Sequence, residues 1–99
     1  MTTREQLCLA INGRNLITFD YDSHSRTIEP HVVYPDSGDE WHIEGWQTAG
    51  YSSRPGTEPW RRYKIDNIKS LTILDDTFTG TRASYVRDSE RYKLACCKL

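Results

Sequence analysis

The spacing of hydrophobic residues changes early in the chain, near residue 13. Before this point, Leu7, Ala10 and Ile11 recur at the spacing of one helix face. Thr3, with Gln6 three residues later, is a candidate N-cap, and Gly13 is a candidate end. The pattern predicts one short amphipathic helix within residues 1–13.

After the helix, hydrophobic and polar residues alternate with the period of two that half-buried strands show. In the first predicted strand, Ile17, Phe19 and Tyr21 share one face. Pro30 lies inside the second strand, where it cannot donate a ladder hydrogen bond, and it therefore predicts an edge, a bulge or a bend. The five predicted strands are NLITFDY, RTIEPHVVYP, EWHIEGWQ, WRRYKI and KSLTIL.

The third predicted strand carries two tryptophans whose positions have opposite parity. Under strict alternation, Trp41 lies on the face of Ile43, and Trp46 lies with His42 on the other face. We therefore expect one of the two rings to be exposed.

Turns and loops set the domain organisation. Residues 22–25, 36–39 and 66–67 are rich in turn formers, and TAGYSSRPGTEP is the longest loop. Five short strands with tight turns favour a bent sheet that closes on itself to hide its edges. We expect a mainly β single domain, with a helix at 1–13, a barrel core at 14–75 and an extension at 76–99. A final strand around residues 92–96 is the only element expected in that extension.

Charge is distributed unevenly along the chain despite a net charge of −1. Residues 20–44 hold seven acidic side chains and one basic one, and basic residues cluster near the fourth strand. There Arg62 and Lys64 share a strand face, which places the two cations about 7 Å apart, close to the phosphate spacing of a nucleic acid strand. A solvated face with ordinary ion pairs is the alternative.

The cysteines bear on the redox state and location of the chain. Cys8, Cys96 and Cys97 are odd in number, and two of them are sequence neighbours, so we expect free thiols. The N-terminus has no apolar signal core and no segment is long and apolar enough for a membrane span, so the expected location is the cytoplasm. No metal or cofactor motif is present, and we expect neither group.

Taken in order, RTIEPHVV, EWHIEGWQ, a variable loop and WRRYKIDNIKSL resemble the WYL domain of prokaryotic regulators. The resemblance covers roughly residues 15 to 75. Trp41 stands at the family's Trp, while His42 and Ile43 replace its Tyr and Leu. Lys64 and Asn67 stand where the family has arginines, so two guanidinium groups are missing.

The resemblance implies an Sm-like or SH3-like barrel that senses a ligand in transcription regulation or phage defence. It further implies binding of a nucleotide or single-stranded nucleic acid on a basic and aromatic face. By matching position, that face comprises Arg26, Trp41, His42, Arg62 and Lys64. Cations pair with phosphate and aromatic rings stack on bases, which gives the same expectation a physical basis.

Two other function classes remain open at this stage. The loop from Tyr51 to Trp60 offers aromatic and proline residues on which a protein partner could dock. An enzyme using His31, His42, Glu29 or Glu44 is the least favoured class, because no nucleophile elbow, phosphate loop or metal-ligand spacing is present. The sequence thus predicts a binding module rather than a catalyst.

Overall fold

The computed structural model of the chain describes residues 1–52, 56 and 58–99. Helix α1 (Thr3–Gly13) opens the chain, as its hydrophobic spacing predicts. The N-cap is Thr2 rather than Thr3, because Thr2 and Glu5 form the reciprocal capping box. Arg14 ends the helix in the left-handed conformation, with φ 54°, and donates its N–H to the last turn.

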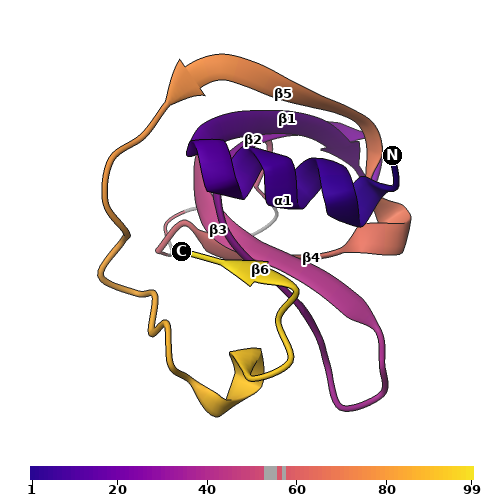
Figure 1. Cartoon of the computed structure of the whole chain (residues 1–99). Helices are drawn as coiled ribbons and strands as arrows, with labels where there is room; N and C mark the ends of the chain where they lie inside the picture. Colours follow the sequence, from indigo (N-terminus) through magenta and orange to yellow (C-terminus); the bar gives the residue numbers. More distant parts are fainter. Residues whose placement is uncertain (53–55, 57) are drawn as a thin grey trace.

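Five strands follow the helix in one antiparallel sheet with the spatial order β4-β3-β2-β1-β5 (Figure 1). The mainly β class is confirmed. The sheet path is open, with β4 and β5 at its two ends, and a closed five-stranded barrel is not established by this pairing. The strands are β1 (Asn15–Tyr21), β2 (His24–Pro35), β3 (Trp41–Gly50), β4 (Trp60–Lys64) and β5 (Lys69–Thr77), with a 3-10 turn, η1 (Ile65–Asn67), between the last two.

The irregularity predicted at Pro30 is present as a register shift within β2. Pairing with β3 shifts between Pro30 and Val32, while β2 continues as one strand. Gly45 lies directly opposite Pro30, and a Cβ atom there would lie 2.3 Å from the Glu29 carbonyl oxygen. The two backbones therefore approach so closely that only glycine fits.

One hydrophobic core lies between α1 and the curved sheet. Leu7 and Ile11 from the helix pack with Ile17, Phe19 and Ile43 from the sheet, and all five are at most 1% exposed. The alternation expected for β1 is confirmed, since Ile17 and Phe19 are buried while Asp20 is exposed.

The expectation that Trp41 or Trp46 is exposed is wrong, because both rings are half-buried. The Arg4 guanidinium covers Trp41 at 4.1 Å from the ring centroid, and that of Arg82 covers Trp46 at 4.6 Å. Both faces of β3 are therefore covered by other parts of the chain.

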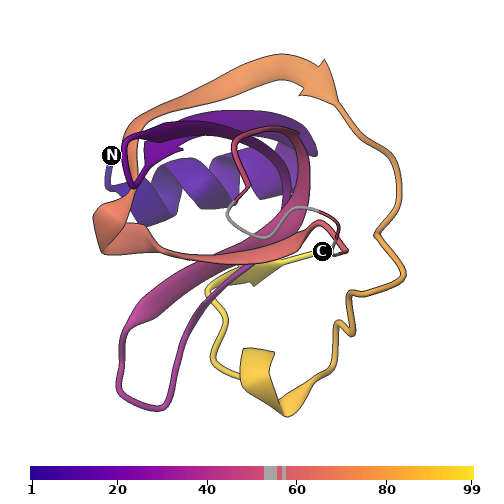
Figure 2. The ribbon, with the colours of Figure 1, turned by 180° about the vertical axis from the view of Figure 1, so that it is seen from behind.

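The extension after β5 runs along one side of the molecule and returns to the sheet, as Figures 1 and 2 show. It contains a 3-10 turn, η2 (Glu90–Tyr92), and a short strand, β6 (Cys97–Lys98), which pairs with β2 at Val32 and Val33. The strand expected at residues 92–96 is thus displaced toward the C-terminus. A second hydrophobic cluster forms beneath the extension from Val32, Tyr34, Tyr85 and Tyr92.

The expectation of three free thiols is wrong for two of the cysteines. Cys8 in α1 and Cys97 in β6 form a disulfide with a Cα–Cα distance of 5.6 Å, and Cys96 is free. The two residues are 89 positions apart, and only the return of the extension to α1 brings them together. Within the described residues, no helix is long and apolar enough to cross a membrane.

Candidate functional site

Arg62 and Lys64 are the two predicted site residues that lie exposed on one strand. Pairing of β3 with β4 places Lys64 opposite His42 and Arg62 opposite Glu44. The Lys64 ammonium lies 3.4 Å from a carboxylate oxygen of Glu40, whereas Arg62 forms no ion pair with any described residue. The Arg62 guanidinium is therefore more available to an anionic ligand than the Lys64 ammonium, which already faces a carboxylate.

Arg26 is enclosed by aromatic rings rather than displayed on the surface. Its guanidinium carbon lies 5.2 to 5.7 Å from the ring centroids of Tyr21, Tyr51 and Tyr63, and the residue is only 5% exposed. One guanidinium nitrogen donates to the Tyr21 carbonyl at 3.1 Å, and the buried Nε has no partner among the described residues. Its contacts connect β1, β4 and the start of the loop after β3 at one end of the sheet.

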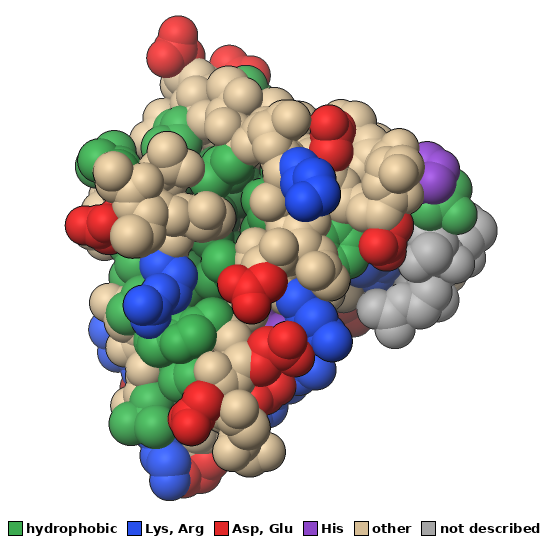
Figure 3. Space-filling model, turned by 90° about the vertical axis from the view of Figure 1, so that its right-hand side faces the viewer, with side chains coloured by type: hydrophobic (Ala, Val, Ile, Leu, Met, Phe, Trp, Pro, Cys, Tyr) green, Lys and Arg blue, Asp and Glu red, His purple; other side chains and the backbone are tan. Residues whose placement is uncertain are grey.

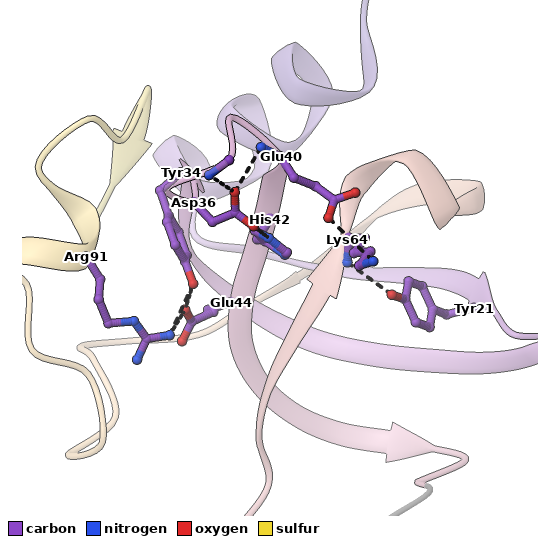
Figure 4. A network of polar contacts seen from close by, with 9 residues as sticks. Tyr21, Tyr34, Asp36, Glu40, His42, Glu44, Lys64 and Arg91 are labelled. Atoms are coloured by element: carbon purple, nitrogen blue, oxygen red, sulfur yellow. Dashed lines mark hydrogen bonds and ion pairs between the residues drawn. The ribbon is translucent and has the colours of Figure 1, made fainter.

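His42 is also buried, at 1% exposure, where it supports the turn between β2 and β3. Its Nε2 lies 2.9 Å from a carboxylate oxygen of Asp36, whose other oxygen accepts the N–H groups of Gly38 and Glu40 (Figure 4). These bonds lower the pKa of Asp36 to about 2, with the His42 hydrogen bond contributing most. The predicted basic and aromatic face is therefore not one continuous surface, since Arg26 and His42 are inside and Trp41 is half covered.

Glu44 is a buried carboxylate on the face of β3 that also carries His42. Strand alternation predicts that this face is exposed to solvent. Glu44 is 1% exposed and accepts four hydrogen bonds from side chains (Figure 4 shows two of the donors). Arg91 Nη2 donates at 2.7 Å, Trp60 Nε1 at 2.7 Å, Tyr92 at 3.2 Å, and Tyr34 donates through a short contact. Burial and the adjacent Glu44 charge raise the pKa of both tyrosine hydroxyls, so these groups remain donors at neutral pH.

Next to this network lies a cavity of about 340 Å³ between the β2–β3 turn and the extension. Its walls carry the three cationic side chains of Arg62, Arg91 and Lys93, with Tyr34 and Leu94 as apolar surface. Pro35, Asp36, Ser37 and Glu90 complete the lining.

The three cations of this cavity differ in how far they are already paired. One nitrogen of Arg91 is held by Glu44, but the side chain is 56% exposed and its other N–H groups have no partner among the described residues. Lys93 lies 3.7 Å from Glu90, an exposed pair of little energetic weight. The cavity can therefore offer several N–H donors to an anion.

Charges of both signs are mixed on the face of the molecule that Figure 3 shows. On the face shown in Figure 3, Lys and Arg side chains alternate with Asp and Glu, and hydrophobic side chains lie between them. Such a mixed surface attracts anions weakly, because each cation is close to a carboxylate.

The loop proposed for protein docking is only partly within the described residues, since Ser53, Arg54, Pro55 and Thr57 lie outside them. At one end, Tyr51 stacks on His24 with a centroid distance of 3.9 Å and is 46% exposed. At the other end, Trp60 is half-buried and bonded to Glu44, so its removal would disturb the interior as well as any docking surface.

Glu29 and His31, the remaining candidate acid and base residues, form hydrogen bonds that hold the extension at Arg82. Glu29 accepts both Nε and Nη2 of Arg82 at 2.8 Å. His31, which is fully buried, directs Nδ1 to the Glu29 carbonyl oxygen at 2.9 Å and accepts the Arg82 N–H on Nε2 at 3.2 Å. Rings of Trp60, Phe78 and Tyr85 pack around its imidazole.

This arrangement makes stability depend on pH through His31. Burial lowers the pKa of His31, outweighing the Glu29 groups that raise it, and the Arg82 and Arg14 charges lower it further. Protonation would also place a hydrogen on Nε2 of the ring, facing the backbone N–H of Arg82 that this nitrogen otherwise accepts. Because the unfolded chain binds a proton near pH 6.5 and the folded chain resists it, stability is present at pH 7 and declines as pH falls below about 6.5.

We expect the free energy of unfolding to fall between pH 7 and pH 5 by up to about 1.4 kcal/mol per pH unit, the limit for one proton. Urea unfolding of the wild type across this range measures the slope. His31→Phe should be less stable at pH 7 but should have a flatter profile. His24→Gln, at an exposed histidine, should keep the wild-type slope, and an unchanged slope in His31→Phe would contradict the assignment.

The cationic cavity was only partly accessible to sequence reasoning. Arg62 was predicted from its strand position, but Arg91, Lys93 and Tyr34 were missed as site residues, because the extension has no periodicity that indicates which side chains turn inward. No family model matches the chain, and neither a curated protein nor a solved structure matches it. The WYL resemblance therefore rests on the sequence motifs alone.

Proposed function

We propose that the chain is a non-catalytic module that binds a nucleotide or the end of a single-stranded nucleic acid in the cavity beside Arg62, Arg91 and Lys93. The observation that carries the proposal is the convergence of these three cations on one cavity of about 340 Å³. Guanidinium groups bind phosphate through paired N–H donors, and Arg62 and Arg91 supply two such groups.

The apolar part of the cavity suits the remainder of a nucleotide. Tyr34 and Leu94 form its walls, and a volume of this size is at the lower end of the range for small-molecule sites. The WYL resemblance supports the same ligand class and also a closed Sm-like or SH3-like barrel, and both remain parts of this proposal. Relative to the face that the resemblance implies, the proposed site keeps Arg62 and replaces the buried Arg26 and His42 with Arg91 and Lys93.

Titration with mononucleotides and a short fluorescent oligothymidylate at low salt tests the proposal. We expect Arg62→Ala to weaken binding about tenfold or more, since a charge-assisted hydrogen bond is lost. Added salt should weaken binding progressively, as phosphate contacts require. Arg62 is exposed on β4, so the variant should fold normally, which circular dichroism verifies.

Lys69→Ala is the matched control, because Lys69 is an exposed cation on β5 and does not line this cavity. It should change binding less than about twofold, in line with the small effect of removing one distant, screened charge. Absence of binding at low salt would contradict the proposal. Equal losses in Arg62→Ala and Lys69→Ala would also contradict it, because they would indicate attraction to overall charge rather than to a site.

A further inference from the structure

The three cysteines of the chain converge at one place, although they come from opposite ends of the sequence. The Cys8 and Cys97 sulfurs form the disulfide, and the Cys96 sulfur lies 3.3 Å from that of Cys8. All three sulfur atoms lie within 4.8 Å of one another. A disulfide needs only two sulfurs, so the third calls for a separate explanation.

We infer that Cys8, Cys96 and Cys97, when reduced, form a three-thiolate site for a thiophilic metal ion, Zn²⁺ or Cu⁺. Zinc binds thiolates at about 2.3 Å, so ligand sulfurs around one ion lie within about 4.6 Å of each other. The three sulfurs lie within 4.8 Å of one another, close to this limit, and breaking the Cys8–Cys97 bond allows these two sulfurs to move apart around an ion. Thiolate ligands favour these two ions over magnesium and calcium, which prefer oxygen.

Two firmly placed elements hold the ligands. Cys8 lies in the middle of α1, which packs its buried face on the sheet core, and Cys97 lies in β6, which pairs with β2. Cys96 precedes β6, and its backbone N–H donates to the Val33 carbonyl oxygen at 3.0 Å. The three sulfurs are therefore brought together by the fold rather than by a flexible segment.

An opening to solvent lies beside the sulfurs. A cavity of about 340 Å³ is lined by Thr2, Arg4, Glu5, Cys8 and Cys96. An ion can enter through this cavity, and it leaves room for water or an external ligand as the fourth ligand of a tetrahedral zinc ion.

Loading the site requires reduction of the disulfide. A dithiol donates two electrons and two protons to the Cys8–Cys97 bond, which gives two thiols, and the dithiol itself becomes a disulfide. The metal ion then forms three metal–sulfur bonds and releases three protons. Oxidation by a disulfide acceptor would reverse the sequence and release the ion.

The test uses the full chain, reduced anaerobically with a water-soluble phosphine and titrated with Co²⁺ as the probe for Zn²⁺. We expect a thiolate-to-cobalt charge-transfer band that saturates at one ion per chain and disappears on addition of Zn²⁺. A parallel titration with Cu⁺, in competition with a chromophoric chelator, determines which ion is preferred. The oxidised protein should show no such band.

Cys96→Ser keeps both partners of the disulfide and removes only the third sulfur, at an exposed position. We expect it to form the disulfide normally but to bind Co²⁺ about tenfold or more weakly, with a weaker charge-transfer band. Glu40→Ala is the control for the other cluster of ligating side chains, Asp36, Glu40 and His42, and it should leave the band unchanged.

Equal binding by Cys96→Ser and the wild type, or no sulfur charge transfer in the reduced protein, would overturn the inference. In that case Cys8 and Cys97 would act only as a disulfide pair. The cavity at the cysteines shares no lining residue with the cavity beside Arg62, so nucleotide titration and cobalt titration test the two proposals separately.

Discussion

Glu44→Ala should lower the free energy of unfolding by about 3–5 kcal/mol, because three donors on buried or half-buried rings lose their acceptor at a cost of about 1–3 kcal/mol each. The substitution leaves the Arg91, Trp60, Tyr34 and Tyr92 donors without their shared acceptor. Each buried donor that loses its partner keeps its desolvation cost without the compensating bond. Since domains of this size are stable by about 5–15 kcal/mol, the variant should be close to unfolding.

Urea unfolding of the wild type, Glu44→Ala and Glu44→Gln measures the effect. Glu44→Gln should be intermediate, because the amide keeps an acceptor oxygen but carries no charge for Arg91. Glu40→Ala is the matched control, since it removes a carboxylate from the same hairpin whose ion pair with Lys64 is largely exposed. It should cost at most about 1 kcal/mol, and a loss this small in Glu44→Ala would contradict the role assigned to the buried network.

The same network explains why the sequence predicts β3 correctly but misjudges its far face. Alternation places His42 and Glu44 together opposite Ile43, and polar residues on one strand face ordinarily indicate solvent. Here that face is covered by the extension, whose Arg91 and Tyr92 supply the partners of Glu44. These partners lie more than 45 residues away in the chain, so no local pattern predicts them.

Sequence patterns correctly predicted the elements whose structure depends on residues close together in the chain. The helix, the alternation in β1 and β4 and the bulge at Pro30 follow from spacing, burial and the missing proline N–H. The Cys8–Cys97 disulfide and the Glu29–Arg82 pair depend on the path of the extension, which has few regular elements of its own.

The residues predicted for the candidate site also differ in whether their exposure depends on the local strand pattern or on the tertiary structure. Arg62 was predicted because its exposure follows from its strand parity, and it lines the cavity. Arg26 has the same charge, but the rings of Tyr21 in β1, Tyr63 in β4 and Tyr51 in the loop after β3 enclose it, which is a property of the tertiary structure. Charge and parity therefore identify exposed cations, while long-range packing decides which of them share a cavity.

The second large effect is expected at Gly45, where the pairing of β2 and β3 leaves no space for a side chain. In Gly45→Ala, the new Cβ would lie 2.3 Å from the Glu29 carbonyl oxygen and 3.1 Å from the Pro30 Cα. Both are backbone atoms, so no side-chain rotation relieves the contact, and the strands must separate at the bulge. Glu29, which binds Arg82, and His31, which anchors the extension, lie on either side of this point.

We therefore expect Gly45→Ala to cost about 3 kcal/mol or more, at the upper end of the range for overpacking, and to loosen the extension along with the sheet. Urea unfolding measures the first effect, and hydrogen exchange of the Arg82 amide, which bonds to His31, measures the second. Gly38→Ala is the control, because its Cβ would meet only the Asp36 side chain at an ordinary 3.5 Å. If Gly45→Ala were as stable as Gly38→Ala, the close backbone approach at Pro30 would be wrong, and with it the register of β2 and β3 that places Gly45 opposite Pro30 and Glu44 opposite Val32.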